Sequence, residues 1–261
     1  MKLFLTITIS FFIIFGILSQ SKAFTFTDDF NRSNSSTIGN NWNVYHGGTS
    51  GISSNQLFLD NGTSESIGNN SAYYNLGVTL DYAIVYGKFR FDIDVVTTDS
   101  STFYIGLNAT VADIERNNTG WGTHGKGYGI AYSGSYSKNY PFFSIIDSTG
   151  STGSPLKWGA GNLTNNQDYN FELIYDNGSL DARFWEYGTD RPEAATFSYA
   201  PGTMPQYSGT NLVFNIGDEG NLYLDYVTVT NVPIPEPGTL ILLAISFCSL
   251  TWLKKYKWGI K

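Results

Sequence analysis

Short apolar and aromatic runs, separated by glycine, asparagine, serine and threonine, recur along the middle of the chain. This pattern is typical of β-strands joined by turns. No long run between them repeats its apolar positions about every 3.6 residues, so strand–helix–strand units are not expected. The pattern therefore predicts an all-β fold, a two-sheet antiparallel β-sandwich over residues 24–231. The predicted strands are Phe24–Phe30, Gln56–Leu59, Ala83–Val95, Thr102–Asn108, Gly127–Tyr132, Phe142–Ile146, Tyr169–Tyr175, Leu180–Tyr187, Leu212–Ile216 and Leu222–Thr230.

The clearest alternation lies in Phe89–Val95, where apolar residues alternate with Arg90, Asp92 and Asp94. Successive side chains of a strand point to opposite faces. The apolar set therefore predicts the face that packs in the core, and the charged set predicts the opposite face.

The best-defined hairpin is predicted around Asn177-Gly178, a preferred two-residue turn because both positions need a positive φ. The turn sets the register of the two flanking strands. In that register the facing pairs are Phe171 with Phe184, Leu173 with Ala182, Tyr175 with Leu180, Glu172 with Arg183, and Asn170 with Trp185. The first three pairs form a continuous apolar face. The opposite charges of the fourth pair support the register, although such a pair contributes only ~0.2–1 kcal/mol.

Both ends of the chain carry apolar runs. Leu3–Leu18 follows Lys2 and ends before Ser21-Lys22-Ala23, a pattern typical of a secretory signal peptide (residues 1–23) cut after Ala23; an uncleaved anchor is the alternative. The C-terminal run, Thr239–Leu253, would reach only ~22 Å as a helix, whereas a bilayer core is about 30 Å thick. Lysines behind that run are expected to stay cytoplasmic, so the sequence predicts that the body is exported.

The tail, residues 232–261, combines a proline-rich stretch, a short hydrophobic helix and a basic end. The residues concerned are Pro235, Glu236, Pro237, Gly238, Lys254, Lys255 and Lys257. Their order resembles the PEP-CTERM sorting signal of Gram-negative bacteria, although the basic residues are lysine rather than arginine and Trp258–Lys261 follow them. The resemblance implies that the tail anchors the protein transiently in the membrane until an exosortase removes it, and that the protein passes to the cell surface or the extracellular matrix. An ordinary C-terminal membrane anchor is the alternative.

The charge of the body indicates which partners it avoids, and its cysteine content indicates how it is stabilised. Without its two ends the chain keeps nine basic and 21 acidic residues, a net charge of −12. Such a body is repelled by nucleic acid and by anionic membranes. Cys248 lies in the tail, so no disulfide is expected in the body, and its stability must come from packing.

Three stretches of the body resemble concanavalin A-like jelly rolls of the LamG or laminarinase-like kind: Asp28–Trp42, Asp168–Glu193 and Leu222–Asn231. The resemblance implies a jelly-roll sandwich. It also implies where a sugar hydrolase of this kind would carry its paired carboxylates, on one strand as Glu-x-Asp-x-x-Glu. That run does not occur in the sequence. No enzymatic activity is therefore expected, with a divergent glycoside hydrolase or polysaccharide lyase as the alternative.

Candidate sugar-binding residues are aromatic side chains that the pattern places on loops or on a polar face. Aromatic rings stack on sugars, and exposed loops often carry binding sites. The glycine-rich stretch 117–128 contains Trp121 and His124, Tyr132 follows it, and Trp185 lies on the polar face of the predicted hairpin. Packing in the core or in turns is the alternative for the aromatic residues, and an ordinary loop histidine is the alternative for His124.

Acidic residues near the first and last strands are candidates for a structural Ca²⁺, because jelly rolls often join these strands through such an ion. The candidates are Asp28, Asp29, Asp218 and Asp225. Ca²⁺ takes six to eight oxygen ligands, and acidic residues solvated at strand ends are the alternative. No other cofactor is expected.

Together these patterns predict a non-catalytic protein of the cell surface or matrix that associates with exopolysaccharide, either as a carbohydrate-binding or as a purely structural component.

Overall fold

A computed structural model of the chain describes residues 23–45, 48–61, 70–92, 100–114, 127–135, 142–146, 157–160, 163–200, 208–217 and 220–232. Within these ranges it describes all side chains except those of 100–102, 133–135, 142–146, 157–158 and 160.

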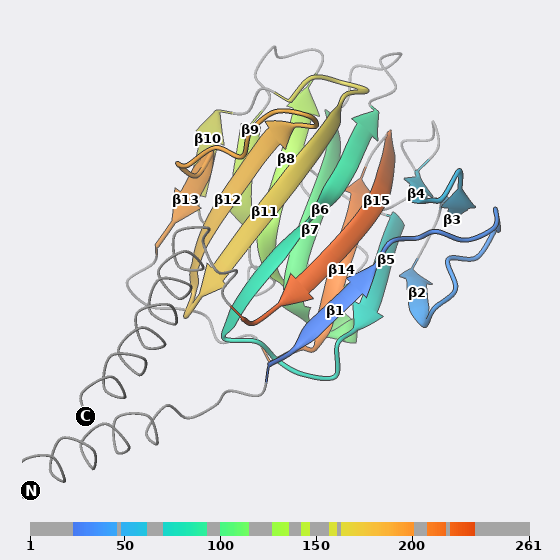
Figure 1. Cartoon of the computed structure of the whole chain (residues 1–261), viewed down its shortest axis with the longest axis horizontal. Coiled ribbons are helices and arrows are strands. Elements are labelled where there is room, and N and C mark those ends of the chain that lie inside the picture. The colour runs from blue at the N-terminus through green and yellow to red at the C-terminus, as the bar shows by residue number, and fades with distance from the viewer. Residues whose placement is uncertain are drawn as a thin grey trace, which may run out of the picture. The chain divides into compact units, whose positions relative to one another are not determined.

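The larger of two antiparallel sheets has eight strands and holds the first and last strands of the body. Figure 1 shows its central strands in front of those of the second sheet. Its order is β13 (Phe197–Tyr199), β12 (Ser179–Glu186), β11 (Asp168–Asp176), β6 (Tyr82–Asp92), β15 (Asn221–Thr230), β4 (Gln56–Asp60) and β3 (Thr49–Ser53), with β1 (Thr25–Asp28) paired to β15.

The second sheet has seven strands. Its order is β10 (Lys157–Ala160), β9 (Phe142–Ile146), β8 (Tyr128–Ser135), β7 (Ser100–Ala109), β14 (Asn211–Gly217), β5 (Asn70–Asn75) and β2 (Trp42–Tyr45). A short helix, α2 (Val111–Ile114), follows β7. All strand pairings in the described chain are antiparallel, so the predicted two-sheet sandwich is confirmed.

Aromatic rings from both sheets form the core between them. Phe89 of β6 is 1% exposed, and its ring centroid lies 5.0 Å from that of Phe103 on β7. The edges of Phe171 and Phe184 meet Phe89 at 5.8 and 6.0 Å. Burying one such ring contributes about 1.5–3 kcal/mol. Packing of this kind stabilises a body that is expected to lack disulfides.

The hairpin of β11 and β12 has the predicted register, with Phe171 opposite Phe184 and Glu172 opposite Arg183. Asn177 and Gly178 both have positive φ, 41° and 98°, as the expected turn requires. The alternation at Phe89–Asp92 is also confirmed, because Phe89 and Phe91 are buried whereas Arg90 and Asp92 are partly exposed. The remainder of that run, 93–95, lies outside the described residues.

Every predicted strand is present, and the structure adds β2, β3, β5, β10 and β13. These additional strands are short. In β5 the buried residues include Asn70, Ser71 and Ala72 in succession, so no alternation marks it in the sequence. Strands covered on both faces lose the period-two pattern.

Candidate functional site

The outer face of the eight-stranded sheet carries partly exposed aromatic, amide and charged side chains. One row of directly opposed residues crosses four adjacent strands: Trp185 on β12, Asn170 on β11, Lys88 on β6 and Tyr226 on β15. All four are partly exposed, and the buried residues that flank them along the strands are Gly87, Phe89, Tyr169, Phe171, Phe184 and Val227. Three strand spacings of about 4.8 Å separate β12 from β15, so the row is about 14 Å long.

Lys88 lies at the centre of this row and contacts two carboxylates. Its Nζ lies 3.1 Å from Asp168 Oδ2 and 3.4 Å from Asp225 Oδ2, and its side chain is 13% exposed. Burial alone would lower the pKa of the Lys88 ammonium, but the hydrogen bond to Asp168 and the charge of Asp225 outweigh burial and raise that pKa. Lys88 therefore stays charged and holds the two acidic side chains beside it.

A β-bulge on β15 orients one of these carboxylates. The pairing of β15 with β6 shifts between Leu224 and Tyr226, so Asp225 is the extra residue. Asp225 and Tyr226 are consequently both partly exposed, although they are consecutive in the chain. A bulge re-aims side chains in this way.

Gly87 makes this bulge sterically acceptable. A Cβ at position 87 would lie 2.3 Å from the backbone oxygen of Tyr226 and 2.8 Å from the ring of Phe171. Gly87 is paired with Val227, the residue that follows the bulge. The glycine thus lets the two strands approach where Asp225 and Tyr226 turn outward.

An aromatic ring lies close to the Lys88 ammonium, and a tyrosine hydroxyl belongs to the same row. Tyr187 directly follows β12 and is 58% exposed, and Lys88 Nζ lies 4.1 Å from its ring centroid. This is a cation–π distance. Burial, followed by the neighbouring Tyr86 and Asp225, raises the pKa of the Tyr226 hydroxyl, so this hydroxyl stays protonated and can donate a hydrogen bond. We call the set Lys88, Asp168, Asp225, Trp185, Tyr187 and Tyr226 the Lys88 patch.

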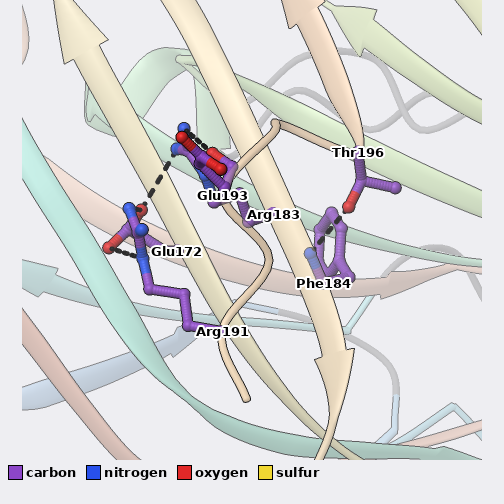
Figure 2. Close-up of polar contacts among 6 residues, drawn as sticks. All are labelled: Glu172, Arg183, Phe184, Arg191, Glu193 and Thr196. Carbon is purple, nitrogen blue, oxygen red and sulfur yellow. Dashed lines mark hydrogen bonds and ion pairs between the residues drawn. The ribbon is translucent and has the colours of Figure 1, made fainter.

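The segment Tyr187–Thr196, which we call the strap, is fastened to this face by an ionic cluster (Figure 2). Glu172 of β11 accepts hydrogen bonds from Arg183 Nη1 at 3.2 Å and from Arg191 Nε at 3.1 Å. Arg183 also donates to the backbone oxygen of Glu193. The side chain of Glu172 is only 8% exposed, so its charge depends on these two guanidinium groups. The cluster fixes the strap that begins with Tyr187.

The outer face of the seven-stranded sheet is different, because it carries a group of buried apolar side chains. Tyr104, Ala131 and Val213 form a second apolar cluster there with Ile114 of α2, and none of the four is more than 1% exposed. This buried cluster contrasts with the partly exposed charged and aromatic side chains of the Lys88 patch on the eight-stranded sheet.

The predicted sugar-binding residues have different positions. Trp185 lies partly exposed on the outer sheet face, as its place in the hairpin predicted. Tyr132 is 2% exposed within the core, and its hydroxyl donates to the backbone oxygen of Leu163. Burial raises the pKa of Tyr132 to about 12. This ring packs in the core and offers no open face to a ligand, which corrects the prediction for Tyr132. Trp121 and His124 lie outside the described residues.

Asp28, a predicted metal ligand, is bound by protein groups. Its carboxylate accepts hydrogen bonds from Arg32 Nη1 at 2.8 Å, Arg32 Nη2 at 3.1 Å, Trp42 Nε1 at 2.9 Å and the Phe30 amide at 2.8 Å. Burial alone would raise the pKa of Asp28, but these hydrogen bonds and the charge of Arg32 hold it below its usual value. Asp28 thus anchors the turn after β1.

The other predicted metal ligands are not gathered around Asp28 by any described contact. Asp225 contacts Lys88, Asp29 is exposed and accepts a hydrogen bond from the Asn31 amide, and Asp218 lies outside the described residues. In the described part of the chain, no three acidic, histidine or cysteine side chains are grouped as a metal site. Asp28 is paired with Arg32, and Asp225 is paired with Lys88.

The predicted sorting residues Pro235, Glu236, Pro237, Gly238, Lys254, Lys255 and Lys257 all lie outside the described residues. Within the described ranges there is no helix with the length and apolar character needed to cross a bilayer.

Comparisons with known proteins identify the fold. No model of a known protein family matches the chain, and no curated protein sequence matches it. Among solved structures, the carbohydrate recognition domain of Emp47p is similar at 12% identity and a TM-score of 0.51, covering 82% of this chain and 98% of that domain.

Two further structures give the same result. Peanut lectin is 13% identical with a TM-score of 0.52, covering 83% of this chain and 100% of the lectin. The exoplasmic domain of VIP36 with bound Ca²⁺ and Man3GlcNAc is 12% identical with a TM-score of 0.51, covering 75% of this chain and 85% of that domain. The body therefore has the concanavalin A-like jelly-roll fold.

Proposed function

We propose that the body of this protein is a non-catalytic carbohydrate-binding domain that associates with extracellular polysaccharide. The fold is shared with the Emp47p carbohydrate recognition domain and with a VIP36 domain that holds Man3GlcNAc. A shared fold does not fix a function. The proposal is therefore carried by one feature of this chain, the Lys88 patch.

The Lys88 patch combines the two kinds of group that sugars need. The exposed ring of Tyr187 and the partly exposed Trp185 offer flat apolar surfaces for the C–H faces of a sugar. Asp168 and Asp225, with side chains 32% and 37% exposed, can accept hydrogen bonds from sugar hydroxyls. The row runs across strands of a rigid sheet, so a few sugar units could lie along it without reorganising a loop.

The two carboxylates of the patch are paired with a cation. A glycoside hydrolase needs one of its two carboxyl groups as a proton donor, whereas Asp168 and Asp225 both contact the ammonium of Lys88. This geometry supports binding over hydrolysis.

The test is retention of the full-length protein on a panel of insoluble β-glucans and acidic polysaccharides, with an assay for released reducing ends and unsaturated sugars. We expect retention without product. Release of either product would favour the alternative of a divergent hydrolase or lyase. Absence of retention on every polysaccharide would favour a purely structural matrix component.

We also propose that the tail delivers the protein as a PEP-CTERM signal, with an exosortase as the processing partner. Support comes from the sequence order of Pro235-Glu236-Pro237, a short apolar run and Lys254 onward. Mass spectrometry of protein released from the source cells should find no peptide beyond Gly238. Recovery of such peptides from released protein, or of the body in the cytosol, would contradict this route.

A further inference from the structure

We propose that the Lys88 patch takes an uncharged glycan and discriminates against polymers of uronic acids. This inference rests on the proposed function, because it names the ligand class of the same site. It follows from how the charges on the outer face of the eight-stranded sheet are arranged.

The charges at the centre of the patch sum to −1. The Lys88 ammonium is shared by Asp168 and Asp225, at 3.1 and 3.4 Å, and is almost covered by its neighbours. A carboxylated sugar that sought this ammonium would displace one of the two acidic side chains or lie beside both of them. Like charges at such separations repel each other.

The charges nearest to the patch do not give it a net positive charge. Arg90 lies two residues along β6 with Asp168 opposite it, and its guanidinium carbon is 4.5 Å from the ring centroid of Tyr223. Asp92 follows on the same face of β6 and has the opposite charge. Arg183 of β12 and Arg191 of the strap both form ion pairs with Glu172 of β11. The body as a whole has a net charge of −12, which opposes the approach of a polyanion.

The hydrogen-bonding groups of the patch also suit neutral sugars. The two carboxylates contact Lys88, and Asp225 also accepts a hydrogen bond from Gln56. Each carboxylate can accept further hydrogen bonds, and a sugar hydroxyl is a donor whereas a uronate carboxylate is an acceptor alone. Tyr226 and Asn170 complete the row with a hydroxyl and an amide, each able to donate and accept. Lys88 Nζ lies 4.1 Å from the centroid of the Tyr187 ring, and the Tyr187 residue is still 58% exposed, which leaves surface for stacking.

The experiment compares binding of the full-length protein to an insoluble neutral β-glucan and to cross-linked polygalacturonate, at low and at high salt. Tyr187→Ala tests the site, Tyr187→Phe keeps the ring, and Val44→Ala is the control because Val44 is 42% exposed on the other sheet. Thermal unfolding of each variant verifies folding. We expect binding to the glucan that salt hardly changes, and binding to polygalacturonate that is weaker by at least about tenfold (about 1.4 kcal/mol). Tyr187→Ala should weaken glucan binding by about tenfold, while Tyr187→Phe and Val44→Ala keep it.

The outcomes separate the two proposals. Stronger binding to polygalacturonate, lost at high salt, would overturn the ligand class and leave carbohydrate binding intact. Glucan binding that Tyr187→Ala leaves unchanged would overturn the site. Binding to neither polymer would overturn the inference for these ligands, and its absence across the whole panel would overturn the proposed function itself.

Discussion

At the scale of single residues, Asp28 illustrates how a buried charge is used for structure. The carboxylate is 4% exposed and receives hydrogen bonds from Arg32, Trp42 and a backbone amide. Removing one partner from a buried, charge-assisted network leaves the other groups unsatisfied. The side chain thereby ties the end of β1 to Trp42 at the start of β2.

Asp28→Asn should destabilise the fold by about 2–3 kcal/mol at neutral pH, because the bonds to Arg32 lose their charge assistance. The folded-state pKa of Asp28 lies below its ordinary value of 3.8. The stability it provides is therefore fully present above pH 3.8 and is lost as the pH falls through the lower, folded-state pKa. Chemical unfolding of the wild type and the variant between pH 7 and pH 2 should show this difference shrinking in the most acidic range.

A difference in unfolding free energy that stays constant down to pH 2 would contradict the role of the charge. Asp29→Asn is the matched control, because the neighbouring Asp29 is exposed and contacts a single backbone amide.

For Lys88, the direction of the side chain could be predicted from the sequence, but its contacts with other residues could not. Lys88 lies between Gly87 and Phe89 in an alternating strand, so its outward direction could be predicted. Its contacts with Asp168 and Asp225 depend on which strands flank β6, and the residues of β6 do not specify these neighbours. Asp225 was predicted as a metal ligand, which identified the residue but not its lysine partner.

At the scale of elements, the β11–β12 hairpin was predictable in full because its information is local. Asn177-Gly178 fixes the turn, and the turn fixes every facing pair. The bulge on β15 was not predicted, although the sequence carries its signal. Leu222 and Leu224 occupy even-numbered positions, whereas Val227 and Val229 occupy odd-numbered ones, and all four side chains are buried. Such a change of parity within one strand requires an extra residue.

Asn177→Pro should break this hairpin, because proline holds φ near −65° whereas Asn177 has φ 41°. We expect the free energy of unfolding to fall by about 3 kcal/mol or more, the cost of placing proline inside a helix, where it is also incompatible with the backbone. Limited proteolysis of the variant should cleave within 168–186. Asn177→Asp is the matched control, since aspartate tolerates this turn. A variant with proline at 177 that stays folded and resists protease would contradict the register.

The strap gives a second prediction at this scale. Glu172→Gln removes the charge that holds Arg183 and Arg191, so the strap should loosen while the sheet persists. Hydrogen exchange of the amides in 187–196 should accelerate, and glucan binding should weaken because Tyr187 is held less firmly. We expect a loss of about 2 kcal/mol in global stability.

Asp181→Asn is the control for Glu172→Gln. Asp181 is a partly exposed acidic residue of the neighbouring strand β12, on the same outer face of the sheet as Glu172. Unchanged exchange in the strap of the Glu172→Gln variant, at unchanged ligand affinity, would show that the cluster does not position Tyr187.

At the scale of the whole molecule, two sheets with aromatic inner faces leave different outer surfaces. The described outer side chains of the seven-stranded sheet include a covered apolar cluster around Tyr104. The eight-stranded sheet keeps charged and aromatic side chains partly accessible. Alternation and turn signals predicted the sandwich, since they report which residues are inside. They could not predict which outer face stays open, because that depends on connections between distant strands.

The proposed function requires that carbohydrate binds on the outer face of the eight-stranded sheet. Hydroxyl-radical footprinting of the full-length protein, with and without a saturating soluble β-glucan oligosaccharide, tests it most directly. We expect that oxidation of Trp185, Tyr187 and Tyr226 falls when the oligosaccharide is bound, while the exposed Val44 on the other sheet is oxidised equally in both samples. Protection confined to the other sheet, with Trp185 and Tyr187 unchanged, would contradict it.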